Sequence, residues 1–485
     1  MNITDLNPKI VWKYFHEITQ VPRPSKKEEK IIKYIESFAE ENNIAIKKDA
    51  AGNILMSKPA TPGMENRQTV ILQAHMDMVC EKNSDKEHDF DNDPLETIIE
   101  GGWLRADGTT LGADNGIGMA AAQAVLASKD IQHGPIECLF TVDEETGLSG
   151  AKAVQAGFMI GTILLNLDSE DEGELFVGCA GGKDTAALFS FEAIPAPANL
   201  QYFRIDVKGL KGGHSGCDIH LGLGNANKLI ARFLYQLKKK HEITLCAING
   251  GNLRNAIARE AHAVFGVAAN AKEDVRVMLN NYTADIEFEL KHADKNVRIT
   301  MESVARPEVA IDKGTAEKLI CSLLACPHGV IGMSHDLEGL VETSTNLASV
   351  KTLTDNTILV GTSQRSSIES CKAAIADQVA ATFKLAGAEV THGDGYPGWA
   401  PNTDSQILRV AQDAYKRLYG KESAIKAIHA GLECGLFREK YPNLDMISFG
   451  PTLRDVHSPN ERIQTDTVEL WWRFLLEILK NIPAK

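Results

Sequence analysis

Side chains that could bind metal ions recur along this chain in a set order. They are His75, Asp77, Asp114, Glu144, Glu145, Asp168 and His457. Most of them follow an apolar, strand-like run, as Val70-Ile71-Leu72 precedes His75. In an open α/β sheet ligands bind at the carboxyl ends of the strands, so these side chains can converge in one cleft. Two imidazoles with several carboxylates are typical of a pair of hydrolytic zinc ions, whereas a structural zinc site favours cysteine.

The adjacent carboxylates Glu144 and Glu145 follow the apolar run at residues 138–142. Two carboxylates at the end of a buried strand repel each other unless cations neutralise them. With zinc nearby, one of them can be a ligand while the other takes a proton from the attacking water and returns it to the leaving amine. The alternative is a solvated loop after the strand.

Asp114 lies in a glycine-rich turn, residues 109–118, that leads into an apolar helix. The glycine spacing matches neither nucleotide-binding pattern, so a carboxylate that bridges two ions is favoured over a phosphate cradle or a helix N-cap. Asp77 is two residues after His75 and therefore on the same side of an extended strand, where it can orient the imidazole. Asp168 opens an acidic run, and His457, in a loop before the last helix, supplies the second imidazole.

A second group of candidates lies in the middle of the chain. His214 follows Gly212-Gly213, and glycines let the backbone approach a ligand closely. An imidazole on such a loop could donate a hydrogen bond to a developing oxyanion, although a tight turn with an incidental histidine is an equal alternative. Asn255 and Arg365 could bind a substrate carboxylate, a bidentate task that suits arginine.

Composition excludes several classes of protein. The 485 residues exceed what one hydrophobic core usually serves, so two or more domains are expected. The net charge of −14 disfavours nucleic acid or an anionic membrane surface as partner. No apolar run is long enough to cross a membrane, and the first residues lack the layout of a signal peptide. The nine cysteines form no C-x-x-C pair, and the odd count argues against a disulfide framework, so a cytoplasmic protein is expected.

The elements that position these residues alternate between strand and helix in the first part of the chain. Helices are expected at 8–19, 28–41, 116–128 and 150–156, and strands at 69–73, 136–142 and 162–167. The pattern resumes at the end with a helix at 404–419, a strand at 444–449 and a helix at 467–482. Such alternation predicts an α/β domain with a mostly parallel sheet flanked by helices.

The middle of the chain differs. A strand-helix-strand-helix order at 203–208, 226–239, 261–269 and 275–291 is followed by strand 297–303, helix 313–324, strands 346–351 and 357–362, and helix 369–386. This order predicts an inserted α+β domain of two ferredoxin-like halves. We therefore expect a catalytic domain split into residues 1–187 and 396–485 around an insertion at 188–395, so that His457 must fold back to meet His75.

The motifs resemble those of the aminoacylase/carnosinase family of dizinc peptidases over nearly the whole chain and in the same order. They are Ala74-His75-Met76-Asp77-Met78-Val79, Gly112-Ala113-Asp114-Asn115-Gly116, Asp143-Glu144-Glu145-Thr146-Gly147, Asn166-Leu167-Asp168 and Gly212-Gly213-His214-Ser215-Gly216. Three further segments resemble the branch of bacterial aminoacyl-histidine dipeptidases: Gly178-Cys179-Ala180-Gly181-Gly182, Tyr396-Pro397-Gly398-Trp399 and His429-Ala430-Gly431-Leu432-Glu433-Cys434-Gly435.

The resemblance implies a zinc-peptidase domain with an inserted lid, two zinc ions that cobalt or manganese could replace, and a role for each residue. His75 and Asp168 would bind one ion, Glu145 and His457 the other, and Asp114 both. Glu144 would be the general base and then acid, Asp77 would orient His75, and His214 would stabilise the oxyanion from the lid. Asn255 and Arg365 would hold the substrate, and Gly435 with its loop would line the pocket near the C-terminal end of the substrate.

The implied activity is hydrolysis of dipeptides, with a preference for Xaa-His substrates such as carnosine. Deacylation of N-acyl-amino acids by the same metal centre is the alternative, because only the pocket would differ. A metal-binding scaffold without activity is a third reading, which the free carboxylate of Glu144 disfavours. A homodimer, in which His214 could act across subunits, is also compatible with the family.

Overall fold

A computed structural model of the chain describes residues 2–485. Contacts divide the chain into two compact units, each of which is described by itself. Unit 1 comprises Met1–Cys179, Trp399–Ala427 and Leu432–Lys485, and unit 2 comprises Ala180–Gly398 and Ile428–Gly431. The short second segment of unit 2 was not anticipated from the sequence, and the domain boundaries after residues 187 and 395 remain predictions beside this division.

Unit 1 is built on an eight-stranded sheet. In spatial order its strands are β1 (Ala45–Lys48), β2 (Ile54–Lys58), β6 (Ile136–Thr141), β3 (Val70–His75), β7 (Ile163–Asn166), β21 (Asp445–Ser448), β8 (Glu174–Cys179) and β20 (Ala424–Ile428). The four strands β6, β3, β7 and β21 are parallel to one another. β3, β6 and β7 are buried along their whole length, which explains their continuous apolar runs. Their carboxyl ends therefore meet along one edge of the sheet.

Helices cover this sheet, as the sequence predicts. They are α1 (Lys9–Thr19), α2 (Glu29–Glu41), α3 (Ala113–Ala127), α4 (Glu144–Gly147), α5 (Ser149–Ala153), α10 (Gln406–Tyr419), α11 (Glu433–Lys440) and α12 (Thr465–Lys480). α3 packs on β3 and on α1, and α10 packs on β21 and on α12. α3 is almost wholly buried, in keeping with its run of alanines, glycines and aliphatic residues.

A small four-stranded sheet in unit 1 brings the end of the chain to its first part. Its order is β22 (Leu453–Arg454), β23 (Arg462–Gln464), β5 (Trp103–Ala106) and β4 (Thr97–Glu100). β23 pairs antiparallel with β5, so that Ile463 lies opposite Leu104. The loop between β22 and β23 carries His457, and this pairing brings it back to the first part of the chain.

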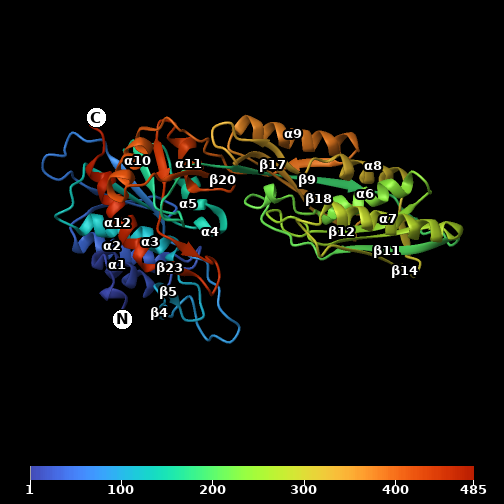
Figure 1. Cartoon of the computed structure of the whole chain (residues 1–485), viewed down its shortest axis with the longest axis horizontal. Helices are drawn as coiled ribbons and strands as arrows, with labels where there is room; N and C mark the ends of the chain where they lie inside the picture. The colour runs from blue at the N-terminus through green and yellow to red at the C-terminus, as the bar shows by residue number, and fades with distance from the viewer. Residues whose placement is uncertain (1) are drawn as a thin grey trace. The chain divides into compact units, whose positions relative to one another are not determined.

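Unit 2 contains a nine-stranded antiparallel sheet. The order along it is β14 (Arg298–Val304), β11 (Leu200–Lys208), β13 (Ala261–Ala268), β12 (Thr244–Gly250), β17 (Val341–Thr352), β18 (Thr357–Ser366), β9 (Gly181–Ser190) and β19 (Glu389–His392), and β16 (Gly329–Met333) pairs with β17. The helices α6 (Ala226–Lys238), α7 (Lys272–Glu289), α8 (Lys313–Ala325) and α9 (Glu369–Leu385) lie against this sheet (Figure 1). Buried side chains of these helices and strands form one hydrophobic core.

The two ferredoxin-like halves are present, but the chain builds the second half differently from the expected repeat. The first half is β11-α6-β12-β13-α7-β14, and the second is β9-α8-β17-β18-α9-β19. Strand 297–303, expected to open the second half, is instead the fourth strand of the first half as β14. β9 takes the opening place because Gly181–Ser190 pairs along its whole length with β18. The first half is thus inserted between the first strand and first helix of the second.

The apolar segments of the chain serve these cores. Among residues 2–485, no helix has both the length and the apolar character needed to cross a bilayer.

Unit 2 additionally contains a two-stranded sheet of β10 (Ala193–Pro195) and β15 (Val309–Ile311), whose residues Ile194 and Ala310 pack in a small apolar cluster with Tyr202.

Candidate metal centre

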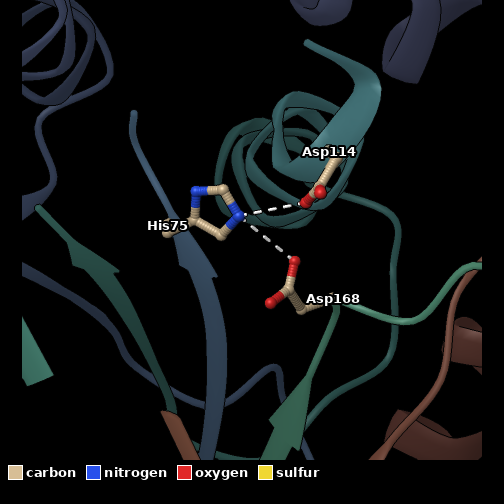
Figure 2. Close-up of side chains that lie close together, drawn as sticks. All are labelled: His75, Asp114 and Asp168. Atoms are coloured by element: carbon tan, nitrogen blue, oxygen red, sulfur yellow. Dashed lines mark hydrogen bonds and ion pairs between the residues drawn. The ribbon is translucent and has the colours of Figure 1, made fainter. Parts of the chain in front are cut away.

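Three of the predicted residues meet at the carboxyl edge of the parallel strands. His75 is the last residue of β3, Asp114 lies in the first turn of α3, and Asp168 follows β7 (Figure 2). His75 Nε2 lies 3.0 Å from Asp114 Oδ1 and 3.3 Å from Asp168 Oδ1. One imidazole nitrogen therefore faces two carboxylates within the spacing of ligands around a single ion.

A second group shares Asp114 with the first. His457 Nε2 lies 3.1 Å from Asp114 Oδ2 and 2.9 Å from Glu145 Oε2. The two oxygens of Asp114 thus point to different imidazoles, one at the end of β3 and the other in the β22–β23 loop. Figure 2 shows the side of Asp114 that faces His75.

The donor set fits a pair of divalent cations. Two ligands at the usual zinc distances on a tetrahedral ion lie roughly 3.3 Å apart, close to the separations found in both groups. Glu145 Oε1 is buried and has no hydrogen-bond donor among residues 2–485, and the buried Asp168 Oδ1 faces the His75 imidazole at 3.3 Å. A buried anionic oxygen without a donor is costly, and a cation between these ligands would satisfy it.

The electrostatics of the group indicate the same need for positive charge. Burial lowers the pKa of His75, but the carboxylates of Asp168 and Asp114 outweigh it and raise this pKa well above its usual value. Hydrogen bonds to Asp114 and Glu145 raise the pKa of His457 to about 11. Burial raises the pKa of Asp168 to about 7. Each imidazole is surrounded by anions, an environment that favours a positive charge on or beside the ring.

Glu144 lies beside the ligand groups. One ligand atom each of His75, Glu144 and Glu145 lies within 4.8 Å of the others. Burial raises the pKa of Glu144 well above its usual value, with a further contribution from the charge of Asp168. A carboxylate with a raised pKa beside a metal centre is suited to accept and return a proton.

Asp77 connects the two sequence motifs that flank the centre. Its Oδ1 lies 3.4 Å from His75 Nδ1, and its two oxygens accept the backbone N–H groups of Glu144 and Glu145 at 3.0 and 3.2 Å. Ser25 donates a hydrogen bond of 2.8 Å to Oδ2. Burial would raise the pKa of Asp77, but these hydrogen bonds and the His75 charge lower it to about 2. Asp77 therefore stays anionic and holds His75 and the Glu144 turn in one arrangement.

Several residues of the centre were not found from the sequence. Arg23 is buried, and its guanidinium donates hydrogen bonds to the carbonyls of Met76, Asp77 and Gly112. Glu461 is buried against the turn that contains Asp114. Both have backbone partners far away in the chain, which no motif reveals. The sequence offers only weak indications of their roles. Arg23 lies in the segment Pro-Arg-Pro-Ser at residues 22–25, and Glu461 lies four residues after His457.

Glu433 is a third such residue. It lies at the start of α11 and is completely buried. Its Oε2 accepts hydrogen bonds from Gln73 on β3 and Thr141 on β6, while its Oε1 has no donor among the described residues. Burial raises its pKa to about 8. The carboxyl group thus links two strands that carry site residues.

The structure places His214, Asn255 and Arg365 in unit 2. The ring nitrogen Nδ1 of His214 accepts the backbone N–H groups of Gly216 and Cys217 at 3.3 and 3.1 Å. Because Nδ1 is an acceptor, the proton of the neutral ring is on Nε2. Burial and the nearby Arg365 charge lower the pKa of His214. His214 is therefore a neutral ring with one N–H available to donate.

The loops around His214 are joined within unit 2. Ser215 donates its backbone N–H to the carbonyl of Asn255 at 2.8 Å, and the Asn255 side chain is exposed. Arg365, on β18, is buried and donates a hydrogen bond of 2.8 Å to the hydroxyl of Tyr396. Its Nε is also buried and has no acceptor among the described residues.

His429 was also missed by the sequence reasoning. It belongs to the short segment of unit 2, is buried, and pairs through Nε2 with the hydroxyl of Ser344 at 2.7 Å. Burial and the charge of Arg365 lower its pKa to about 3. A Cβ atom on Gly216 would lie 2.2 Å from the His429 carbonyl oxygen, so the His214 loop packs directly against it.

Gly435 does not lie in a loop as expected. Gly435 is buried in the first turn of α11 in unit 1. Its backbone N–H donates a hydrogen bond to the carbonyl of Leu432, the residue that precedes the helix. Its assignment to the substrate pocket remains a prediction.

Comparisons with known proteins agree on one family. Residues 71–481 match the model of peptidase family M20/M25/M40. A cytosol non-specific dipeptidase of Escherichia coli (strain K12) is 45% identical over 483 residues, which cover 100% of this chain and 99% of that protein. The crystal structure of an aminoacylhistidine dipeptidase from Vibrio alginolyticus is similar with a TM-score of 0.94 and 46% identity, covering 100% of this chain and 99% of the other.

A more distant likeness concerns the fold alone. A tripeptidase structure from Staphylococcus aureus has a TM-score of 0.57 and 17% identity, over 98% of this chain and 99% of that chain. The architecture of two units is therefore shared well beyond the relatives that are similar in sequence.

Proposed function

Because the chain belongs to peptidase family M20/M25/M40, we propose that it is a zinc-dependent dipeptidase that prefers Xaa-His substrates such as carnosine. The relative from E. coli is named a non-specific dipeptidase and the one from V. alginolyticus an aminoacylhistidine dipeptidase, and both names support dipeptide hydrolysis. The name of the first relative also places the enzyme in the cytosol, and we propose the same compartment here. Whether the active protein is a homodimer remains a prediction.

The observation that carries this proposal is the position of Asp114 between two imidazoles. Its oxygens lie 3.0 Å from His75 Nε2 and 3.1 Å from His457 Nε2. We propose that Asp114 is shared by two ions, with His75 and Asp168 completing one ligand set and Glu145 and His457 the other. When bound, two such cations supply the positive charge that polarises a peptide carbonyl and acidifies the attacking water.

The protein groups then divide the proton transfers among themselves. Glu144, whose pKa is raised by burial, accepts the proton of the attacking water and returns it to the leaving amine. Asp77 holds the Glu144 backbone and the His75 ring, which fixes the base relative to its neighbours. The raised pKa makes Glu144 a stronger proton acceptor than an ordinary glutamate.

Residues of unit 2 are proposed to bind the substrate and its transition state. His214 donates its Nε2–H to the developing oxyanion, a role suited to a neutral imidazole. Arg365 binds the free carboxylate of the dipeptide, and Asn255 contributes a hydrogen bond to the substrate backbone. A requirement for a free carboxylate would restrict cleavage to the peptide bond next to the C-terminal residue.

The test is hydrolysis of carnosine and Ala-His beside Ala-Ala, Ala-Leu and N-acetyl-amino acids, with chelator-treated and zinc-restored protein. Zinc-dependent cleavage of dipeptides, fastest with the two Xaa-His substrates, is the expected result. Equal rates on all dipeptides would keep the dipeptidase and refute the Xaa-His preference.

The second candidate function is deacylation of N-acyl-amino acids, which the same donor set could catalyse. Cleavage of N-acetyl-amino acids without cleavage of dipeptides would replace the dipeptidase assignment by this one. Full activity of metal-free protein would refute the proposed zinc centre itself.

A further inference from the structure

A single buried carboxylate binds the whole turn that contains Asp114. Glu461 Oε2 accepts the backbone N–H groups of Leu111 and Gly112 at 2.8 and 3.0 Å, and Oε1 accepts those of Ala113 and Asp114 at 2.7 and 3.4 Å. The Glu461 side chain is only 2% exposed. Four consecutive N–H donors converge on one anion, so this turn has the form of a closely fitted anion site that the protein fills with its own side chain.

A buried cation holds the same turn from its other side. Arg23 donates hydrogen bonds to the Gly112 carbonyl and to the carbonyls of Met76 and Asp77. A Cβ atom on Gly112 would lie 2.5 Å from the Arg23 guanidinium, which leaves room only for glycine at this left-handed position with φ of 64°. The turn is thus fixed between Glu461 and Arg23.

Glu461 and His457 belong to one loop, and that loop is strained. His457 has φ of 61° and Asp455 φ of 55°, left-handed values that non-glycine residues rarely adopt. Such conformations persist where surrounding contacts determine them. The β22–β23 pairing closes this loop on itself, β23 pairs with β5, and His457 also contacts Glu145. The contacts that join the loop to the Asp114 turn itself are the four N–H groups on Glu461 and the His457–Asp114 pair.

We infer that Glu461 is a positioning residue that sets His457 against Asp114 and so forms the second ion site. This inference rests on the proposed function. His457 and Asp114 are 343 positions apart in the chain. Glu461 joins the loop that contains His457 to the backbone of the turn that contains Asp114. His75 and Asp168 reach Asp114 from β3 and β7 and do not depend on this contact. Removal of Glu461 should therefore weaken one ion site and spare the other.

The experiment is a titration of chelator-treated full-length protein with Zn²⁺, followed by calorimetry, for the wild type and Glu461→Gln. In the variant an amide NH₂ faces two backbone N–H donors, so the turn and the loop separate. We expect an unchanged affinity for one equivalent and a 10–100-fold weaker affinity for the other, the range for losing a residue that orients ligands. Turnover should recover with excess Zn²⁺, with KM close to that of the wild type.

Glu137→Gln is the matched control. Glu137 is also buried, at 4% exposure, and its Oε2 accepts two backbone N–H groups, those of Ile160 and Gly161, both at 2.9 Å. Loss of these bonds should lower the melting temperature and leave both zinc affinities unchanged. If Glu461→Gln folds poorly, Glu461→Asp keeps the charge, reaches only part of the turn, and should weaken the same single site to a lesser degree.

The outcomes separate this inference from the proposed function. Two unchanged affinities in Glu461→Gln, or equal weakening of both, would overturn the positioning role while the dizinc proposal stands. The positioning role would also be overturned if Glu137→Gln weakened one zinc site as much as Glu461→Gln does, because the effect would then come from general destabilisation. A wild-type protein that binds fewer than two equivalents would refute the dizinc centre, and with it this inference.

Discussion

The histidines of the metal centre in unit 1 and His214 and His429 in unit 2 are in opposite electrostatic environments. In unit 1, carboxylates outweigh burial and raise the pKa values of His75 and His457. In unit 2, burial and the charge of Arg365 lower those of His214 and His429. The same type of side chain therefore suits two different roles. A histidine surrounded by carboxylates is suited to bind a metal ion together with them, and a histidine beside a guanidinium is suited to act as a neutral hydrogen-bonding group.

This contrast explains why the two units tolerate different buried groups. Unit 1 collects several acidic groups that are stable together only if positive charge joins them. In unit 2 the half-buried ring of His214 and the buried ring of His429 have lowered pKa values, and the buried guanidinium of Arg365 has an Nε without an acceptor among the described residues. In the function that we propose, the metal ions would be bound by unit 1 and the substrate carboxylate by Arg365 of unit 2.

Glu144→Gln should give the largest effect and tests the unit 1 side of the contrast. The amide keeps the shape but cannot accept the proton, so turnover should fall by roughly 10²–10⁴-fold. Zinc content, measured by elemental analysis, should stay at the wild-type level. Turnover near that of the wild type would remove Glu144 from the mechanism.

His214→Ala tests the unit 2 side. Loss of an oxyanion donor should lower kcat by roughly 10²–10³-fold, without loss of zinc. His328→Gln is the control, because burial likewise lowers the pKa of His328, to about 4, although it lies outside the proposed site. Equal losses in the two variants would mean that unit 2 depends on its histidines for stability and not for catalysis.

Arg365→Met sharpens the contrast by removing only the cation of unit 2. A charge-assisted hydrogen bond contributes about 1.5–3 kcal/mol, so KM for a dipeptide should rise roughly 10–150-fold with a smaller change in kcat. Steady-state rates on Ala-His and on its C-terminal amide provide the check. The wild type should discriminate strongly against the amide and the variant should not; undiminished discrimination would show that another group binds the carboxylate.

His429→Gln should give the smallest effect, on stability as a function of pH. The unfolded imidazole binds a proton below its usual pKa near 6.5, whereas the folded one binds it only near 3, so stability falls as the pH drops through this window. From pH 7 to pH 5 this single group costs about 2 kcal/mol. Urea unfolding in the presence of a chelator should therefore show a smaller decrease in the free energy of unfolding from pH 7 to pH 5 in the variant than in the wild type. Identical decreases in the two proteins would exclude His429 as the source.

The convergence of His75, Asp114 and Asp168 could be predicted from the sequence because two of them follow buried strands. His75 and Asp168 follow buried parallel strands, and such strands bring their ends to one edge whatever the rest of the chain does. The supporting residues could not be predicted. Arg23 and Glu461 act on backbone groups, and backbone partners leave no pattern in the types of residue around them.

The fold shows a similar division. In unit 1 the parallel strands β3, β6, β7 and β21 and six of the helices could be predicted with boundaries within a few residues of those found. The other four strands of the sheet, β1, β2, β8 and β20, were not predicted. The exchange of strands in unit 2 was not predicted either, because β9 opens with Gly181-Gly182-Lys183-Asp184, which does not read as a strand. Its identity is decided by pairing with β18, more than one hundred and fifty residues later.

The order of synthesis gives the His457 loop one more consequence. At roughly 5–20 residues per second, a ribosome needs on the order of 20 to 70 seconds to pass through the 343 residues between Asp114 and His457. During that time the nascent chain already contains Glu144, His75 and Asp168, but neither the second imidazole nor the glutamate that anchors it. A nascent chain that has not yet reached His457 and Glu461 therefore lacks the second proposed ion site, whatever its first part has already folded into.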